Sequence, residues 1–430
     1  MYEPGCDRTS REALQSLFSE CSINGKPGFS AEYWNNRICE GEVVATDQIS
    51  TPFHFTTTGA TTFAPGVEIT NFSARYESVF RPSQSGDVAF RFQLDGEVTL
   101  MVDGEQVAQK VYVKNPTNLY TLQAKAGKEY HIEILFKQRN ERATLDFDLG
   151  KQVEINLNLA VEKVKDADVV LFAGGISPSL EGEEMPVEVP GFKGGDRTDI
   201  ELPAVQRDLL KALKKAGKKV VFINYSGSAI GLVPESNTCE AILQAWYPGQ
   251  AGGTAIVDVL FGDYNPAGRL PVTFYKDAGQ LPDFEDYSMK GRTYRYMQQQ
   301  PLFPFGHGLS YTTFTYGEAN LSKNTIGDGG TVTLTIPVSN AGQRDGDEVV
   351  QVYLRCMADK EGPHYTLRAF KRVHIPAGET KQVTIPLTYE SFEWFDTATN
   401  TVHPLKGTYE LLYGGSSDKN KLKTIVMNVQ

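Results

Sequence analysis

One loop of the sequence gathers three carboxylates, Glu181, Glu183 and Glu184. Neighbouring carboxylates repel one another, so at least one of them tends to keep its proton, as a general acid must near neutral pH. The loop follows the apolar run 169–173, and ligands of open α/β sheets bind beside loops at the carboxyl ends of parallel strands. These residue types suit acid–base chemistry, although composition alone favours a solvated acidic turn.

The elements on both sides of this loop predict a parallel sheet. Residues 169–173 and 220–223 are short runs rich in branched apolar residues, as is typical of buried strands. Between them, Val205, Leu209 and Leu213 recur at helical spacing, and the helix should end near Gly217. Strand, helix and strand form a βαβ unit, and residues 241–260 continue the alternation.

Two β domains are expected around this α/β part. From residue 28 to 154 the pattern alternates like strands, with Asp95-Gly96 and Asp103-Gly104 as expected hairpin turns. Residues 315–430 predict an immunoglobulin-like sandwich. The predicted fold class is multidomain α/β plus all-β, in which a β-sandwich insertion interrupts an incomplete α/β sandwich.

The predicted boundaries follow from these patterns. Residues 1–27 carry a short helical pattern around Ala13 to Phe18 and are expected to be a remnant of the α/β domain. The remaining segments are the insertion (28–154), the α/β domain (155–275), a connector without a sustained period (276–314) and the C-terminal sandwich (315–430).

Composition narrows the class of ligand. The chain has 430 residues, with 42 Lys and Arg against 53 Asp and Glu, so its net charge is −11. This balance disfavours nucleic acid and fits a neutral or cationic ligand. No apolar run is long enough to span a membrane, and the N-terminus lacks the apolar core of a secretory signal.

Other candidate sites have better structural explanations. The five cysteines show no Cys-x-x-Cys spacing, which indicates ordinary thiols. The segment 224–228 resembles a serine-nucleophile turn only superficially and predicts a strand-end turn. Asp95 and Asp103 lie in expected hairpins and not in a calcium loop, so we expect no metal and no cofactor.

Several longer motifs resemble glycoside hydrolase family 3. Its acid/base loop resembles 180–182 with 195–203, and further family motifs resemble 246–253, 260–274 and 303–314, the last before a fibronectin type III-like domain. Residues 28–36 look like the start of the protective-antigen-type module inserted in some β-glucosidases and β-xylosidases. The resemblance covers nearly the whole chain.

That resemblance implies a retaining β-glycosidase acting on terminal β-glucosides or β-xylosides. In this family an Asp nucleophile on an N-terminal barrel works with an acid/base Glu on the α/β sandwich, and the two carboxyl groups must come within ~5–5.5 Å. The motif position implies Glu181 as the acid/base, with Glu184 as the alternative, while Asp196 and Arg197 would brace the loop.

No Asp-Trp or Lys-His motif of the family's barrel occurs in this sequence. The expected partners are therefore a β-linked oligosaccharide or glycoside and a barrel domain of the same enzyme, and the chain alone should be inactive. The alternative hypothesis is a non-catalytic carbohydrate-binding or assembly fragment. Analogy with exported relatives predicts a periplasmic or secreted protein, and the sequence leaves the sugar and the oligomeric state open.

Overall fold

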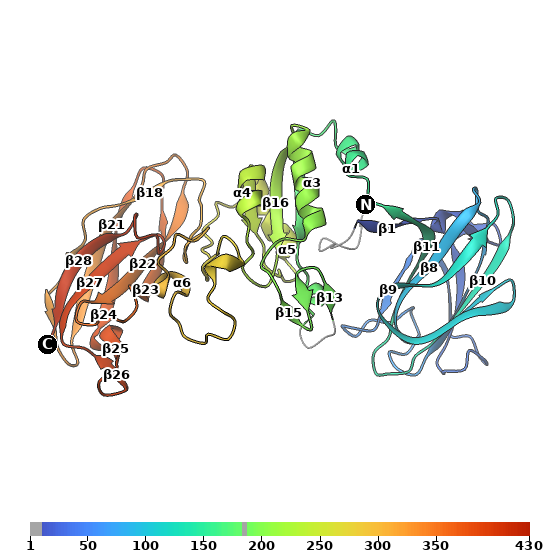
Figure 1. Cartoon of the computed structure of the whole chain (residues 1–430), viewed down its shortest axis with the longest axis horizontal. Coiled ribbons are helices and arrows are strands. Elements are labelled where there is room, and N and C mark those ends of the chain that lie inside the picture. The colour runs from blue at the N-terminus through green and yellow to red at the C-terminus, as the bar shows by residue number, and fades with distance from the viewer. Residues whose placement is uncertain (1–10, 183–186) are drawn as a thin grey trace. The chain divides into compact units, whose positions relative to one another are not determined.

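The computed structural model describes residues 11–182 and 187–430, which fall into two compact units (Figure 1). One unit is Ser10–Asn156, and the second contains Leu157–Gln430. The predicted fold class is confirmed, since the first unit is all-β and the second combines an α/β part with a β sandwich. No helix among the described residues is long and apolar enough to cross a membrane.

The first unit is built on one extensive sheet whose strands run in the order β1-β11-β8-β10-β7-β2-β3, with β4, β5, β6 and β9 added at its sides. Its strands are β1 (Glu12–Ser16), β2 (Cys21–Ile23), β3 (Lys26–Pro27), β4 (Phe29–Trp34), β5 (Ala45–Ile49), β6 (Phe53–Thr56), β7 (Ser73–Phe80), β8 (Gly86–Val102), β9 (Glu105–Ala124), β10 (Tyr130–Lys137) and β11 (Thr144–Glu154).

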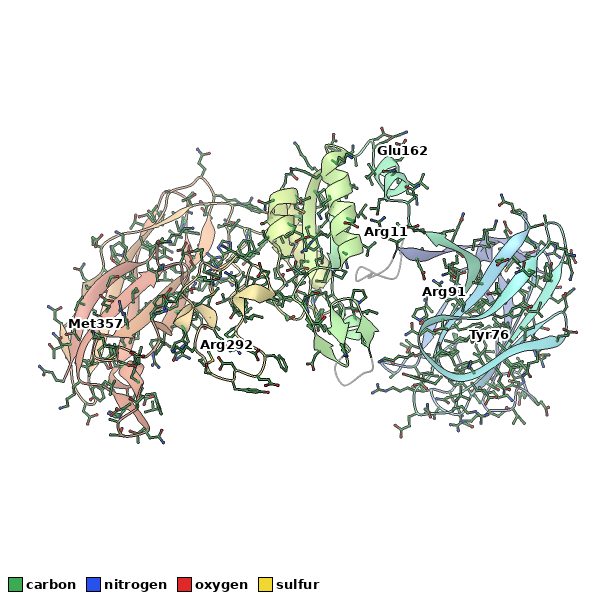
Figure 2. The ribbon with its side chains drawn as sticks, in the orientation of Figure 1. Arg11, Tyr76, Arg91, Glu162, Arg292 and Met357 are labelled. Carbon is green, nitrogen blue, oxygen red and sulfur yellow. The ribbon has the colours of Figure 1, made fainter. Side chains whose placement is uncertain are left out.

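An aromatic core holds this unit together. Alternate residues of β7, β10 and β11 are buried, as expected for strands with one face turned inward. Tyr76 lies within the body of the unit (Figure 2) and is fully buried. Its ring packs 4.7 Å from that of Phe53, and Phe53 lies 5.2 Å from Phe147, so rings from three strands contribute to one core.

The prediction of a helix around Ala13 to Phe18 is wrong. Residues 12–16 form strand β1, which pairs antiparallel with β11 from Glu12↔Glu154 to Ser16↔Gly150. The apolar spacing there is too short to separate helix from strand, and the free edge of β11 decides the outcome. The described residues up to 27 therefore pack with the first unit and not, as the sequence predicts, with the α/β domain.

The hairpin expected at Asp95-Gly96 is also wrong, whereas Asp103-Gly104 does form the turn between β8 and β9. Strand β8 continues through Gly96, and its register against β9 shifts between Asp95 and Val98. Gly96 has φ +137°, and a Cβ there would lie 2.5 Å from the Phe136 ring. The glycine thus marks a bulge under a packed aromatic ring, not a chain reversal.

The second unit begins with the predicted parallel sheet, in the order β12-β16-β17. Its strands are β12 (Val169–Gly175), β16 (Lys219–Tyr225) and β17 (Ala241–Gln244), and its helices are α1 (Leu157–Lys163), α3 (Ala204–Lys215), α4 (Val233–Thr238) and α5 (Gly252–Phe261). Helix α3 buries Val205, Leu210 and Leu213, which confirms the βαβ prediction.

The described residues between β12 and α3 form short elements. They are helix α2 (Pro178–Glu181) and the three-stranded sheet β13 (Glu188–Val189), β14 (Phe192–Lys193) and β15 (Asp196–Arg197). Glu183 and Glu184 lie outside the described residues. Arg197, in β15 of this small sheet, lies 3.4 Å from Ser228 in the loop after β16.

The connector has no long element, as predicted. Its helix α6 (Thr293–Tyr296) and the short helix η2 (Ala278–Gln280) are joined by loops. Arg292, labelled in Figure 2, stabilises the loop before α6 by donating from Nε to the Ser288 carbonyl at 3.0 Å.

The C-terminal sandwich packs two sheets around an aliphatic and aromatic core. One sheet has the path β18-β21-β19, with β24 also paired to β21, and the other has the order β20-β28-β27-β22-β23. The strands are β18 (Phe314–Tyr316), β19 (Asn320–Leu321), β20 (Thr325–Ile326), β21 (Thr331–Asn340), β22 (Gly346–Cys356), β23 (Thr366–Ile375), β24 (Thr380–Thr388), β25 (Glu393–Asp396), β26 (Thr401–Pro404), β27 (Gly407–Gly414) and β28 (Lys423–Val429), with η3 (Tyr389–Phe392) before β25.

Candidate functional site

Glu181 ends the short helix α2, just beyond the carboxyl end of β12. Ser177 begins this helix: its side chain accepts the Leu180 amide at 3.2 Å, and Pro178 occupies the first helical position. The helix ends at Gly182, whose φ of +59° lies in the left-handed region. A capped single turn thus places the Glu181 carboxyl at the edge of the sheet where α/β folds bind ligands.

The hydroxyl of Tyr247 lies between two oxygen acceptors. It is 3.0 Å from Glu181 Oε2 and 2.8 Å from the carbonyl oxygen of Ile176. A hydroxyl has one proton to donate, and a carbonyl or a carboxylate has none. Both contacts are hydrogen bonds at the same time when the Glu181 carboxyl carries a proton and donates it to the Tyr247 oxygen.

Burial and the neighbouring charge of Glu181 both raise the pKa of Tyr247. Tyr247 therefore keeps its own proton across the physiological range. It is a neutral hydroxyl that stabilises Glu181 in either protonation state, by donating to the carboxylate or by accepting from the acid.

The second oxygen of Glu181 contacts Ser228, in the loop after β16, and Ser228 in turn contacts Arg197 of β15. Ser228 Oγ donates to Glu181 Oε1 at 3.4 Å, and Arg197 Nη1 lies 3.4 Å from the same Ser228 Oγ. Arg197 also donates from Nη2 to the Glu201 carbonyl at 3.2 Å and lies over the Phe192 ring. Burial lowers the pKa of Arg197, although nearby carboxylates oppose this effect, so a charged guanidinium faces the site.

Two glycines permit the close approach of these segments. A Cβ on Gly227 would lie 2.6 Å from the Tyr247 ring and 3.3 Å from Glu181 Oε2. Gly175, at φ +132°, has no room for a Cβ, which would lie 1.9 Å from the Tyr225 carbonyl oxygen. Any larger residue at either position would displace the Glu181 loop.

The end of β12 is held by a side chain from α3. Gln206 accepts the Gly175 amide and donates to the Gly175 carbonyl, each at 2.8 Å. The buried amide thus pairs with the backbone of Gly175 as a neighbouring strand would, and it fixes the chain two residues before the Ser177 cap.

Asn224, Ser226 and Gln244 form a hydrogen-bond cluster in which Asn224 and Ser226 are buried and Gln244 is half-buried. Asn224 Nδ2 donates to Gln244 Oε1 at 2.6 Å, and Gln244 Nε2 donates to Ser226 Oγ at 3.1 Å. The cluster joins the carboxyl ends of β16 and β17, from which Ser228 and Tyr247 project.

An ion-pair cluster holds the segment after β15 against helices α3 and α4. Arg207 contacts Glu235 at 2.7 Å and Glu201 at 2.6 Å, and Glu235 is 1% exposed. Burial alone would lower the pKa of Arg207, but the hydrogen bonds to both carboxylates raise it. Glu201 also links this cluster to Arg197, because its backbone carbonyl accepts a hydrogen bond from Arg197 Nη2.

The structure brings together two of the four predicted site residues. Glu181 and Arg197 meet at Ser228, while the exposed Asp196 pairs through its backbone with Lys193 in the small sheet. Glu184 lies outside the described residues.

Sequence reasoning missed Ser228 and Tyr247. Both follow the carboxyl end of a parallel strand, and that position was the signal available in the sequence. The sequence predicts a purely structural turn around Ser228 and marks Tyr247 only as part of a family motif.

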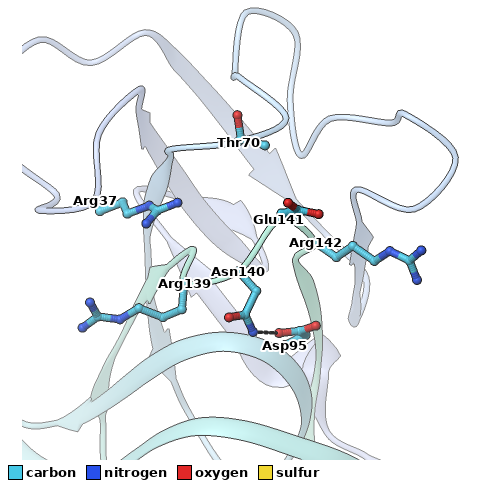
Figure 3. A pocket seen from close by; sticks show the side chains of 7 residues that line it. All are labelled: Arg37, Thr70, Asp95, Arg139, Asn140, Glu141 and Arg142. Atoms are coloured by element: carbon cyan, nitrogen blue, oxygen red, sulfur yellow. Dashed lines mark hydrogen bonds between the residues drawn. The ribbon is translucent and has the colours of Figure 1, made fainter.

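The first unit has a hollow of about 710 Å³ lined by Arg37, Arg139 and Arg142 (Figure 3). Asn140 and Asp95 are hydrogen bonded within it at 2.8 Å. Arg139 is engaged by the buried Glu97, and in the view of Figure 3 Arg139 and Arg142 point to opposite sides. The arginines do not converge on one point, and no cluster of metal-ligating side chains occurs in residues 11–182 and 187–430.

Family models match most of the second unit and part of the first. The glycosyl hydrolase family 3 C-terminal domain matches residues 75–311, and the fibronectin type III-like domain matches residues 348–417. The two matches cover the candidate site and much of the C-terminal sandwich.

Similar proteins carry glycosidase names. A xylan 1,4-beta-xylosidase of Xylanibacter ruminicola is 46% identical over the whole of this chain and 50% of its own length. A periplasmic beta-glucosidase of Salmonella typhimurium is 38% identical over 55% of this chain and 31% of its own length. The chain thus spans about half the length, or less, of these relatives.

Solved structures share the fold. A beta-glucosidase of Kluyveromyces marxianus in complex with glucose has a TM-score of 0.67 at 24% identity, over 98% of this chain and 53% of that one. A beta-glucosidase of Erythrobacter marinus has a TM-score of 0.55 at 32% identity, over 65% of this chain and 38% of that one.

Proposed function

This chain belongs to glycoside hydrolase family 3, and from that membership we propose that it is the part of a retaining, exo-acting β-glycosidase that supplies the acid/base carboxyl. The observation that carries the proposal is the contact of the Glu181 carboxyl with the Tyr247 hydroxyl, which accommodates Glu181 as an acid and as a base. The names of the relatives support terminal β-xylosides or β-glucosides as substrates.

The reaction needs a second carboxylate, an Asp nucleophile on a barrel domain that is not among the residues of this chain. In the first step the nucleophile attacks the anomeric carbon while Glu181 donates its proton to the departing glycosidic oxygen. In the second step Glu181, now a carboxylate, takes a proton from water, and the water oxygen attacks the anomeric carbon and releases the nucleophile.

The neighbours of Glu181 suit both steps. In the acid form the carboxyl donates toward Tyr247 until the leaving oxygen takes the proton, and in the base form Tyr247 and Ser228 both donate to the carboxylate. Arg197 stabilises the negative charge through Ser228. Its role is to position and polarise Ser228, because its Nη1 lies 3.4 Å from the Ser228 Oγ that donates to Glu181.

The test replaces each loop carboxylate in turn in a protein that joins a family barrel to this chain. Glu181→Gln should lower kcat/KM on methyl β-xyloside, a substrate with a poor leaving group, by about 10²–10⁴-fold, while a dinitrophenyl glycoside retains its first step. Azide should restore turnover of the dinitrophenyl substrate, because it replaces the water that needs a base.

Glu183→Gln and Glu184→Gln are the matched controls, since each removes one charge from the same loop. If Glu181→Gln keeps full activity on methyl β-xyloside and one control loses it, the acid/base assignment moves to that control residue. If all three keep activity, the loop does not supply the acid.

By analogy with exported enzymes of this family, we also propose that the protein is periplasmic or secreted. Fractionation of the native host, with this chain detected by antibody, tests that proposal. Recovery from the cytoplasmic fraction would contradict it.

A further inference from the structure

A cavity of about 280 Å³ lies between the connector and the C-terminal sandwich. The segment after α6 forms one wall, and the ends of β22 and β27 with their following loops form the other. Both walls belong to the same compact unit. Small-molecule sites usually measure roughly 300–1,000 Å³, so this cavity suits a ligand of about one ring.

Packed tyrosines build the floor of the cavity. Tyr294 stacks on Phe305 with ring centroids 4.8 Å apart, and Tyr365 lies 5.6 Å from Tyr294. The Tyr365 hydroxyl donates to the Ser417 carbonyl at 2.7 Å, and the Tyr294 hydroxyl accepts the Leu367 amide at 3.1 Å. The rings are therefore fixed in place and offer a rigid, largely apolar surface.

Amide groups line the rim. Gln298, Gln299 and Gln300 are consecutive, exposed and all at the cavity. Gln298 Nε2 lies 3.2 Å from His364 Nε2, and Gln299 is held by Gln280 at 3.2 Å. Carboxamides both donate and accept hydrogen bonds, as sugar hydroxyls do.

The charged side chains that line the cavity are Arg355, Asp418 and Lys419. Arg355 pairs with Glu410 at 3.3 Å, and Asp418 pairs with Lys421 at 3.8 Å. Arg355 and Asp418 therefore have counterions, and Lys419 is exposed to solvent, which screens its charge. A neutral ligand with many hydroxyls fits this lining better than an anion.

One polar group in the wall lacks a partner. Ser417 lines the cavity, is 3% exposed, and its Oγ has no hydrogen-bond partner in the described part of the chain. A buried hydroxyl without a partner destabilises the free protein. Rotation between staggered side-chain conformations would turn this hydroxyl toward a ligand in the cavity.

We propose that this cavity between the connector and the C-terminal sandwich binds one unit of a neutral saccharide, with the tyrosine floor against the apolar face of the sugar and the glutamine rim around its hydroxyls. The proposal does not depend on the acid/base role of Glu181.

Calorimetric titration of the whole chain with xylotriose and cellotriose tests the proposal. We expect saturable binding of at least one of them with millimolar or tighter affinity. The double variant Gln298→Ala with His364→Ala should weaken it at least fivefold, whereas Gln343→Ala, an exposed glutamine outside the cavity, should leave it unchanged.

Ser417→Ala separates a binding role from a structural one. If the hydroxyl serves the ligand, this variant weakens binding by about five- to tenfold while the melting temperature of the free protein stays the same or rises. A fall in melting temperature with unchanged affinity would overturn this assignment.

Glu181→Gln distinguishes this site from the proposed catalytic one, and it should leave binding unchanged. The proposal fails if neither sugar binds saturably, if binding survives the cavity variants, if Glu181→Gln abolishes it, or if glucuronic acid binds while the neutral sugars do not.

Discussion

Tyr247 and Glu181 share one hydrogen bond whose direction depends on where the proton lies. The same hydroxyl also faces the Ile176 carbonyl, so the tyrosine always has one acceptor available. A group of this kind holds the carboxyl in place without fixing its protonation state. Tyr247 is therefore a positioning residue for the acid/base step.

Tyr247→Phe removes this hydroxyl and keeps the ring. In the barrel-containing enzyme we expect kcat/KM on substrates with poor leaving groups to fall by about five- to tenfold, the equivalent of one hydrogen bond, and to change less on activated aryl glycosides. Kinetics across a series of leaving groups measures the difference, with the exposed Tyr287→Phe as control. An equal loss on every substrate would indicate a purely structural role.

The buried Asp148 should make the stability of the first unit depend on pH. Burial raises its pKa to about 6, although Ser16 Oγ and the Leu149 amide both donate to it. A raised pKa in the folded state means that the folded protein binds the proton more tightly than the unfolded one. The stability from this group is present below the unfolded value near 4 and is lost as the pH rises through about 6.

The free energy of unfolding of this unit should therefore fall by on the order of 2–3 kcal/mol between pH 4 and pH 7 on account of Asp148. Asp148→Asn keeps the acceptor oxygen and should flatten that dependence and stabilise the unit at pH 7. Hydrogen exchange of β8 and β11 amides measures the unit by itself. An unchanged pH slope in the variant would contradict the prediction.

The sequence identifies the residues of the site that carry formal charge but not the hydroxyls that serve them. Glu181 and Arg197 stand out in a motif, whereas Ser228 and Tyr247 have types that occur on most protein surfaces. Their importance comes from the parallel strands that end together, and from Gly227, which lets them approach. That information is in the three-dimensional arrangement and only partly in the spacing of the motif.

At the scale of elements, the motif after α5 joins the α/β part to the C-terminal sandwich. Asn265 Oδ1 accepts the Tyr311 amide at 2.8 Å, and its Nδ2 donates to the Asp345 carbonyl at 2.9 Å. Arg269 forms a 2.9 Å ion pair with Glu348, whose side chain is 7% exposed. Burial raises the pKa of Glu348, an effect that Arg269 partly offsets.

Arg269→Met should lower the free energy of unfolding by about 3–5 kcal/mol, because it leaves a buried carboxylate without its counterion. Adding Glu348→Gln removes that charge and should recover at least half of the loss. Urea denaturation of the four proteins of this double-mutant cycle measures both effects. A loss below about 1 kcal/mol in the single variant would show that solvent reaches Glu348.

Secondary structure was predictable where a pattern repeats over many residues. The helix α3 and the strands β12 and β16 occur where their sequence patterns predict them. The failures are local: β1 takes its conformation from the edge of β11, and Gly96 takes its role from the ring of Phe136. In both cases the local structure is determined by a partner that is distant in sequence, so a pattern of neighbouring residues does not contain it.

At the scale of the whole molecule, the first unit has its own core and its ends lie together. The carbonyl of Arg11 accepts the Ile155 amide at 2.6 Å, and β1 closes the sheet against β11. Residues 10–156 expressed alone should therefore fold and unfold cooperatively, which calorimetry and circular dichroism will show. Residues 18–156, without β1, should be markedly less stable, and equal stability of the two fragments would contradict the role of β1.

The pairing of β1 with β11 also determines how this unit responds to force. Both ends of the unit leave from the same end of an antiparallel ladder, next to the pair Glu12↔Glu154. Tension between the flanking segments would load that pair first and open the ladder one pair after another, like a zipper, instead of shearing all five pairs at once. The unit is therefore mechanically compliant along the direction in which the chain enters and leaves it.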